Sequence, residues 1–122
     1  MRNFLIVPLC LLCGCASNYT LEGEITKIEE WRYTSQAKVI SQEEQLDNQY
    51  KYDFFYATVY EISGPPNEFG FRDKKLFVKR GLLHFKINDK VEVEYDSGPE
   101  VHMLGDSTGR RYCKAHKLNY KK

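Results

Sequence analysis

The stretch from Tyr50 to Ser63 constrains the fold more than any other part of the chain. Its alternate positions form two sets, and both are largely apolar: Phe55, Ala57 and Val59 in one, and Tyr52, Phe54, Tyr56, Thr58, Tyr60 and Ile62 in the other. A strand with two apolar faces must be covered on both sides, which favours a central position in a sheet. Gly64-Pro65-Pro66-Asn67 then predicts the end of this strand, because proline cannot donate to a β ladder.

Four further segments have the pattern of β-strands. In Lys90–Asp96 strict alternation places Val91, Val93 and Tyr95 inward and Glu92 and Glu94 outward. A strand is also expected from Leu21 to Ile28, continuing toward Tyr33. Its alternation falls out of step at Ile28, so we expect a bulge or bend near Lys27. The remaining two are Lys75–Lys79 and Arg110–Tyr120; in the latter Tyr112, Lys114, His116 and Leu118 are expected to oppose Cys113, Ala115 and Lys117.

These strands are joined by turns rather than helices, which predicts an all-β fold, a small five-stranded antiparallel barrel or sandwich. The order of the elements resembles the OB-fold over most of residues 20 to 120. A Gly-containing first strand is followed by a long second strand, a short third strand and a connector that leads into Ile87-Asn88-Asp89-Lys90-Val91-Glu92-Val93. We expect one domain at 20–122, with a long polar loop at 34–49 that contains about one weak helical turn.

The amino terminus has the anatomy of a secretion signal. Arg2 supplies a positive charge, and residues 4–12 form an apolar run too short for a permanent membrane span, which needs about 20 residues. Leu12-Cys13-Gly14-Cys15 follows, and it resembles the lipobox of bacterial lipoproteins, although Ala or Ser is commoner than cysteine at position 13. An ordinary cleaved signal or a buried strand is the alternative interpretation.

The lipoprotein resemblance implies a lipid anchor on Cys15. Its sulfur would carry a diacylglycerol, cleavage after Gly14 would remove residues 1–14, and the new amino group would be acylated as well. Residues 15–19 would then be a short tether. Because Ala16 is not the aspartate that retains lipoproteins in the inner membrane of enteric bacteria, the resemblance implies an outer-membrane anchor with the domain facing the periplasm.

Removal of the signal would leave Cys113 as the one free thiol, for which an inert buried position is favoured over an intermolecular disulfide. The net charge of the chain is +1, which argues against nucleic acid as a partner. The charge is uneven, however, since residues 107–122 carry six bases and no acid: Arg110, Arg111, Lys114, Lys117, Lys121 and Lys122. This basic strip is either a solvated strand face or a contact with lipid headgroups, peptidoglycan or an acidic partner.

No set of residues predicts catalysis, a metal site or a cofactor. Gly105-Asp106-Ser107-Thr108-Gly109 is superficially similar to the nucleophile loop of serine proteases, but the chain is too short for that fold and a polar turn explains the residues better. Cys113 and His116 have the spacing of metal ligands, yet residues three apart on a strand face opposite ways. We therefore expect a protein that is not an enzyme.

Aromatic residues give the candidate binding surface. Tyr and Phe are dense between Tyr50 and Tyr60, and Trp31 and Tyr33 lie on the preceding strand. OB-folds bind ligands on aromatic sheet faces, although rings of this kind also fill small barrels. The candidate binding residues are Trp31, Tyr33, Tyr56, Tyr60, Arg110, Arg111 and Lys114. The sequence thus favours a lipid-anchored binding or interaction module, inhibitor- or immunity-like, for an envelope protein or peptidoglycan; an envelope glycan-acting enzyme is the alternative.

Overall fold

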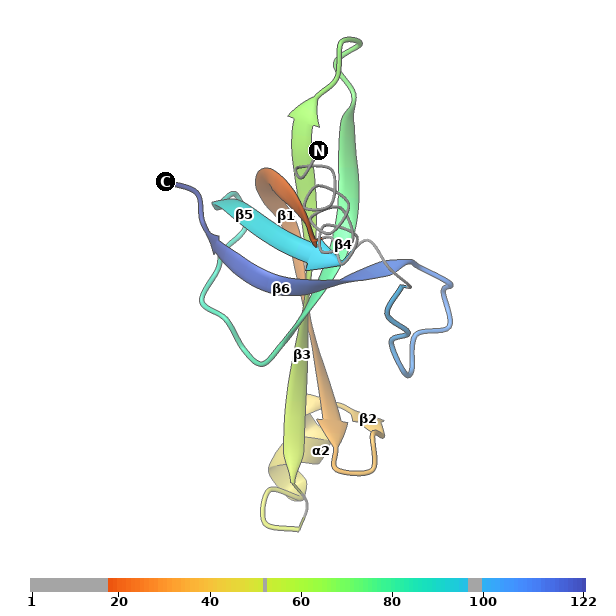
Figure 1. Ribbon diagram of the computed structural model, residues 1–122. Helices are drawn as coiled ribbons and strands as arrows, with labels where there is room; N and C mark the ends of the chain where they lie inside the picture. Colours follow the sequence, from red (N-terminus) through yellow and green to blue (C-terminus); the bar gives the residue numbers. More distant parts are fainter. Residues whose placement is uncertain (1–17, 52, 97–99) are drawn as a thin grey trace, which may run out of the picture.

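The computed structural model describes residues 18–51, 53–96 and 100–122, so the predicted signal, Cys15 and most of the tether lie outside the described residues. Nearly all of the secondary structure is β (Figure 1). The elements in chain order are β1 (Asn18–Thr34), β2 (Val39–Ile40), α2 (Gln42–Asp47), β3 (Phe54–Pro66), β4 (Arg72–Arg80), β5 (Lys90–Asp96) and β6 (Tyr112–Tyr120). β1 therefore includes Asn18 and Tyr19, which the sequence assigned to the tether.

Five of the strands close into a barrel in the order β1-β3-β4-β6-β5, and β5 pairs back onto β1. All neighbours are antiparallel except β4 and β6, which are parallel through Leu76–Val78 and Tyr112–Lys114. The prediction of an antiparallel barrel or sandwich is wrong in this respect. Strand directions cannot alternate all the way round a closed ring of five, so at least one neighbouring pair has to be parallel. The closed mixed barrel is OB-like.

β1 is long enough to pair with two partners. Its first part, from Asn18 to Glu24, pairs with β5, and its second part, from Glu24 to Thr34, pairs with β3. The two ladders meet near Gly23, where a Cβ atom would collide with the Ser63 carbonyl oxygen and the Ile62 side chain, so that only glycine fits. The register shifts between Ile25 and Lys27, which confirms the bulge expected near Lys27.

β3 continues through the two prolines that were expected to end it. Pro66 pairs with Arg72, and the register with β4 shifts between Ser63 and Pro66. The prediction is wrong because the ladder with β1 has already ended at Ser63, which pairs with Glu24. Beyond this point β3 pairs with β4 alone, and proline is tolerated at such an edge or bulge.

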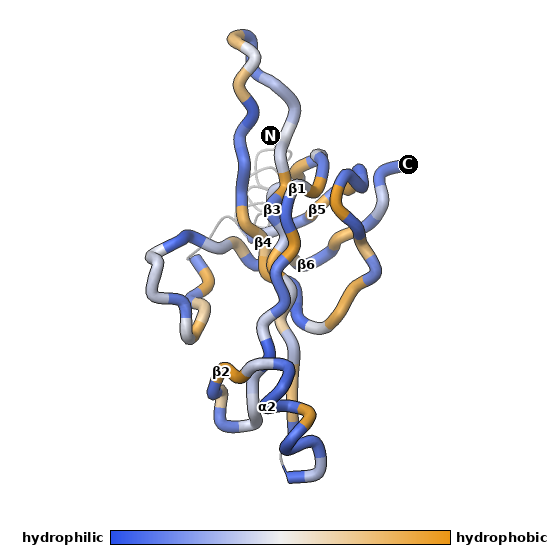
Figure 2. Tube along the Cα trace, turned by 180° about the vertical axis from the view of Figure 1, so that it is seen from behind, coloured by the Kyte–Doolittle hydropathy of each residue, from blue (hydrophilic) through white to orange (hydrophobic). Residues whose placement is uncertain are grey.

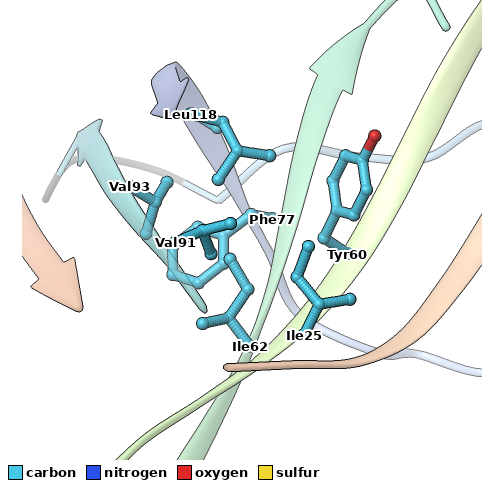
Figure 3. Close-up of a cluster of buried hydrophobic side chains, with 8 residues drawn as sticks. Ile25, Tyr60, Ile62, Phe77, Val91, Val93 and Leu118 are labelled. Carbon is cyan, nitrogen blue, oxygen red and sulfur yellow. The ribbon is translucent and has the colours of Figure 1, made fainter. Parts of the chain in front are cut away.

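The barrel interior is the main hydrophobic core. It contains Ile25, Tyr60, Ile62, Phe77, Val91, Val93, Ala115 and Leu118, all nearly inaccessible to solvent (Figure 3). The connector between β4 and β5 covers this core as an extended segment, with Leu83 and Phe85 packed against it. Val91 and Val93 point inward, as the alternation of their strand predicted.

A second hydrophobic cluster lies on the opposite face of β3, outside the barrel. Ala57 and Val59 belong to it, whereas Tyr60 and Ile62 face the interior, as expected for a strand with two apolar faces. The segment 100–111 between β5 and β6 covers the cluster with Val101 and Met103. This second cluster gives the protein a covered outer face on which a site can form.

β6 departs from the predicted alternation. Tyr112 belongs to the outer cluster, but Ala115 and Leu118 both point into the barrel although they lie three residues apart. The register with β5 shifts so that Tyr95 pairs with Ala115 while Glu94 pairs with Lys117. The extra residue is His116, and the resulting bulge reverses the phase of the strand.

The polar segment 34–49 is partly ordered. β2 pairs with the end of β1, and α2 is capped by Ser41, whose side chain accepts a hydrogen bond from the Glu44 amide. Ile40 is buried, and Val39 packs against the outer cluster. Only the part after Ile40 therefore has the solvated character that the composition predicts.

Candidate functional site

A groove with a volume of about 360 Å³ lies on the outer face of the barrel. Its floor comes from β1, β3 and β4, and one wall comes from residues 102–104 of the segment that covers the outer cluster. The lining is mainly apolar and includes Phe55, Ala57, Val78, Met103 and Leu104. This volume is at the lower end of the range of ligand pockets, which is typically about 300–1,000 Å³.

Two stacked rings form the inner end of the groove. The Tyr33 and Phe55 rings are 5.1 Å apart between centroids and only 13° from parallel. The Arg80 guanidinium lies 5.2 Å from the centroid of the Phe55 ring, a cation–π contact. Tyr33 is itself buried, and its hydroxyl donates a hydrogen bond of 3.2 Å to the Leu104 carbonyl. The floor and the wall are thus joined before any ligand binds.

Tyr56 and Arg80 also belong to the lining of the groove. The side-chain amide of Gln45, on α2, donates a hydrogen bond to the Tyr56 hydroxyl, and the Tyr56 carbonyl accepts one from the Gly81 amide. His102 lines the groove from the covering segment and is exposed. Arg80 and His102 therefore offer a cation and an imidazole beside the apolar lining.

An ionic latch holds the covering segment against the barrel. The Arg110 guanidinium binds Glu29 on β1 in a bidentate manner, with distances of 2.8 and 2.9 Å, and its Nε lies 3.4 Å from Asp106. Asp106 also accepts hydrogen bonds from the Thr108 amide and hydroxyl and from the Tyr112 hydroxyl. Two parallel charge-assisted bonds fix both position and orientation. We call these residues, Glu29, Asp106, Thr108, Arg110 and Tyr112, the latch.

The latch shifts the pKa of each titrating member in the direction that favours the network. The Arg110 hydrogen bonds lower the pKa of Glu29 to about 2, against the opposing effect of burial. The Thr108 and Tyr112 hydrogen bonds lower the pKa of Asp106. Burial, followed by the bond to Asp106, raises the pKa of Tyr112 to about 12. Both carboxylates are therefore ionised at neutral pH and hold Arg110 as a charged partner.

The aromatic residues predicted to form one exposed surface do not share a face. Tyr60 is 0% exposed and belongs to the barrel core, so the expectation that it is available to a partner is wrong. Tyr33 is buried as well and forms the inner end of the groove, whereas Trp31 is half-buried and packs against the outer cluster. Tyr56 is half-exposed and among the residues that line the groove, but it alternates with Phe55 and Ala57, so its ring lies on the other face of β3, where its hydroxyl bonds to Gln45.

The basic candidates are also separated. Arg110 belongs to the latch, so its charge is paired with Glu29 and Asp106 of the same chain. Arg111 is exposed, with its Nε 3.8 Å from Glu100, and Lys114 is exposed on β6. Lys121 of the same strip pairs with Glu22 at 2.7 Å. The basic strip is therefore partly neutralised by acids from other parts of the chain.

Sequence reasoning missed Phe55, Arg80, His102 and Met103 as groove residues. Phe55 lies on the strand face opposite the candidates Tyr56 and Tyr60, and the register that brings Arg80 beside β3 is invisible in the sequence. One signal was present in the sequence: the apolar Val101, Met103 and Leu104 stand in a segment otherwise typical of a loop. Such residues indicate a loop that folds back over an apolar surface.

Other chemistry does not appear in the described residues. Residues 18–51, 53–96 and 100–122 contain no group of three or more His, Cys, Asp or Glu side chains placed to hold a metal ion. The same part of the chain has no helix with the length and apolarity needed to cross a bilayer. Cys113 is a free thiol packed against the barrel core, and burial raises its pKa. Its environment suits an inert cysteine better than a nucleophile.

Comparisons with known proteins do not assign a family. No protein-family model matches the chain, and no curated protein is significantly similar to it.

Proposed function

We propose that this protein is a lipid-anchored binding module of the bacterial envelope, which holds an apolar side chain of a protein partner in the groove on its outer face. The groove carries this proposal, because its floor and wall are already joined by the Tyr33–Leu104 hydrogen bond and the latch. A preformed apolar pocket binds without first paying the entropy of ordering its own walls.

The position of the groove supports a binding role. OB-folds take their ligands on the face of their second and third strands, between the loops that follow the first and fourth strands. The equivalent elements here are β3 and β4, with the segments 35–53 and 97–111. The described parts of these segments supply His102, Met103 and Leu104 to the groove.

The chemistry of the lining favours a protein side chain over a glycan. Sugar sites need several hydrogen-bonding groups beside their aromatic rings, and the groove lining here is mainly aliphatic and aromatic. The Tyr33 hydroxyl is turned to the Leu104 carbonyl, and the Tyr56 hydroxyl bonds to Gln45. An apolar or aromatic residue beside a carboxylate would fit the floor and Arg80 together.

The anchor is supported by the lipobox-like Leu12-Cys13-Gly14-Cys15, with Cys15 as the acylated residue and the outer membrane as the location. Two or three acyl chains give stable attachment, whereas a single chain is marginal. The module would then present its groove to proteins of the periplasm or of the membrane surface. Inhibition of such a partner, as in immunity proteins, is one consequence of this arrangement.

The groove is tested by two matched leucine substitutions. Leu104 lines the groove and is 46% exposed, while Leu82 lies on the β4–β5 connector and is 49% exposed. A photo-crosslinking residue in place of the exposed His102 would join the bound partner to the groove in living cells. We expect one dominant protein adduct, reduced about three- to tenfold by Leu104→Ser, because a partner that covers the exposed half of this side chain gains about 0.7–1.5 kcal/mol.

The Leu82→Ser chain should form the adduct at the level of the wild type, and all three chains should melt at similar temperatures. Crosslinking to a glycan instead of a protein would contradict the protein partner and indicate a saccharide ligand. Equal crosslinking by the Leu104→Ser and wild-type chains would contradict the groove as the binding site.

A further inference from the structure

The hairpin between β3 and β4 ends in two phenyl rings that pack against little of the protein. Phe69 is 74% exposed and Phe71 is 71% exposed. The hairpin projects from the barrel, at the end of the molecule opposite α2, and its tip is hydrophobic on an otherwise hydrophilic arm (Figures 1 and 2). Exposed large apolar groups clustered on a projection mark an interaction site.

The turn that carries these rings is held in one shape. The Asn67 side-chain oxygen accepts hydrogen bonds from the amides of Phe69 and Phe71, at 2.9 and 3.0 Å. The Asn67 amide donates to the Phe71 carbonyl at 2.7 Å, and Gly70 adopts a φ of +86°, which suits glycine. A preorganised turn thus presents both rings outward.

We propose that this hairpin tip inserts into the surface of the phospholipid bilayer. The inference rests on the lipid anchor proposed above. From Cys15 to Asn18, where β1 begins, the chain is three residues long and reaches at most about 11 Å. A domain tethered this closely lies against the lipid headgroups, and a projection with an apolar apex gains free energy by entering them.

The charges behind the rings match the depth profile of a bilayer. Arg72 and Lys74 follow Phe71 by one and three residues, which at about 3.4 Å per residue places them about 3 and 10 Å behind it. Rings at the boundary of the acyl chains would therefore leave these cations at the level of the phosphates. Glu68 and Asp73 offset part of the charge, so residues 66–75 carry three bases and two acids, a net +1. The rings, more than the anionic lipid fraction, then set the affinity.

A convex tip fits a lipid surface better than a protein. Protein partners use concave pockets to receive an anchor residue, and a bilayer accepts a projecting ring without any matching shape. The groove described above lies on another part of the barrel, lined by the second half of β1 and the end of β4. Insertion of the hairpin therefore leaves the groove open to its own partner.

A tryptophan at the tip tests the insertion directly. The chain carrying Phe69→Trp is purified from a bacterial host and reconstituted in phosphatidylethanolamine–phosphatidylglycerol vesicles, with or without brominated acyl chains. The native Trp31 is the only tryptophan of the chain, so the unsubstituted protein gives the background. Leu46→Trp is the matched control, because Leu46 is an exposed apolar residue on α2, at the opposite end of the molecule.

We expect a blue-shifted emission for the Phe69→Trp chain and quenching by brominated lipid about twofold or more above that of the Leu46→Trp chain, since an inserted ring lies about 5–10 Å deep. Phe71→Trp should behave in the same way and replaces the first variant if that one is unstable. Emission unchanged by brominated lipid at every lipid concentration, in both tip variants, overturns the insertion. Mass spectrometry of the Cys15 peptide tests the lipid anchor separately. A peptide without acyl groups contradicts the anchor, whereas insertion of the hairpin is decided by the quenching alone.

Discussion

Removing the charge of Glu29 should loosen the segment that covers the groove, and it should do so only where the carboxylate is ionised. The pKa of this group falls from its ordinary 4.5 to about 2 because Arg110 binds it through two hydrogen bonds. At about 1.4 kcal/mol for each pKa unit, this lowering corresponds to roughly 3 kcal/mol. The Glu29 side chain remains 22% exposed and is screened by solvent, which reduces the expected contribution to about 1–2 kcal/mol.

The sign of the pH dependence follows from the direction of the shift. A carboxylate whose pKa is lowered by folding stabilises the folded state fully above its unfolded value. This stabilisation is lost as the pH falls from about 4.5 toward 2. Glu29→Gln should therefore unfold at a lower urea concentration at pH 7, and its difference from the wild type should shrink to near zero at pH 2.

Urea denaturation between pH 7 and pH 2 measures this difference. Asp106 also has a lowered pKa, so both chains lose stability in acid, and only their difference isolates Glu29. Glu22→Gln is the matched control, because Glu22 pairs with Lys121 at the surface and such exposed pairs contribute little. Wild-type and Glu29→Gln curves that stay parallel over the whole range would refute the latch as a source of stability.

Three further predictions concern the anchor, the core and the polar segment. Cys15→Ser should abolish membrane attachment in cell fractionation and leave the melting temperature of the domain unchanged; attachment that still requires detergent would contradict the lipid anchor. Tyr60→Ala should lower the free energy of unfolding, measured by urea denaturation, by about 3–5 kcal/mol, because the ring is 0% exposed in the barrel core. Trp31→Ala should lower it less, because Trp31 is only half-buried. Equal losses of stability in the two variants would contradict this difference in burial. Replacing 41–51 by a short Gly/Ser linker should cost under about 1 kcal/mol, since loop closure depends weakly on length. A replacement that includes Val39 and Ile40 should cost more, because Ile40 is buried and Val39 packs against the outer cluster. Equal melting temperatures for the two shortened chains would show that β2 adds nothing.

The sequence predicted the strands well where one local pattern decides each of them. β5 alternates strictly, and β3 has two apolar faces, so their burial followed from single-residue periodicity. The irregularity in β1 was also visible, because the alternation of apolar residues falls out of step at Ile28 and a bulge or a bend is needed to restore it; the register shift lies between Ile25 and Lys27. The bulge at His116 left no comparable trace, since β6 carries polar residues on both sides of it. Its position depends on how β6 meets β5 and β4.

The site could be predicted less well than the fold, because it depends on pairings between distant segments. Tyr33 and Phe55 stack because their strands pair in that register, and Leu104 reaches them from 71 residues beyond Tyr33. Composition identified the right strands and the aromatic residues on them. It could not distinguish Tyr60, which faces the interior, from Tyr56, because the two share a strand face and differ only in how far along the barrel they lie.

The two hydrophobic clusters separate the stability of this protein from its proposed binding. The barrel core is closed by strands on all sides, and its residues are almost fully inaccessible. The outer cluster has strands on one side only and relies on the segment 100–111, which is held by the latch, the Val101–Tyr112 bridge and the Tyr33 hydrogen bond. Segments held by a few such contacts open at lower free energy than a core does. Variation in this segment can therefore reshape the groove, while the barrel beneath it stays folded.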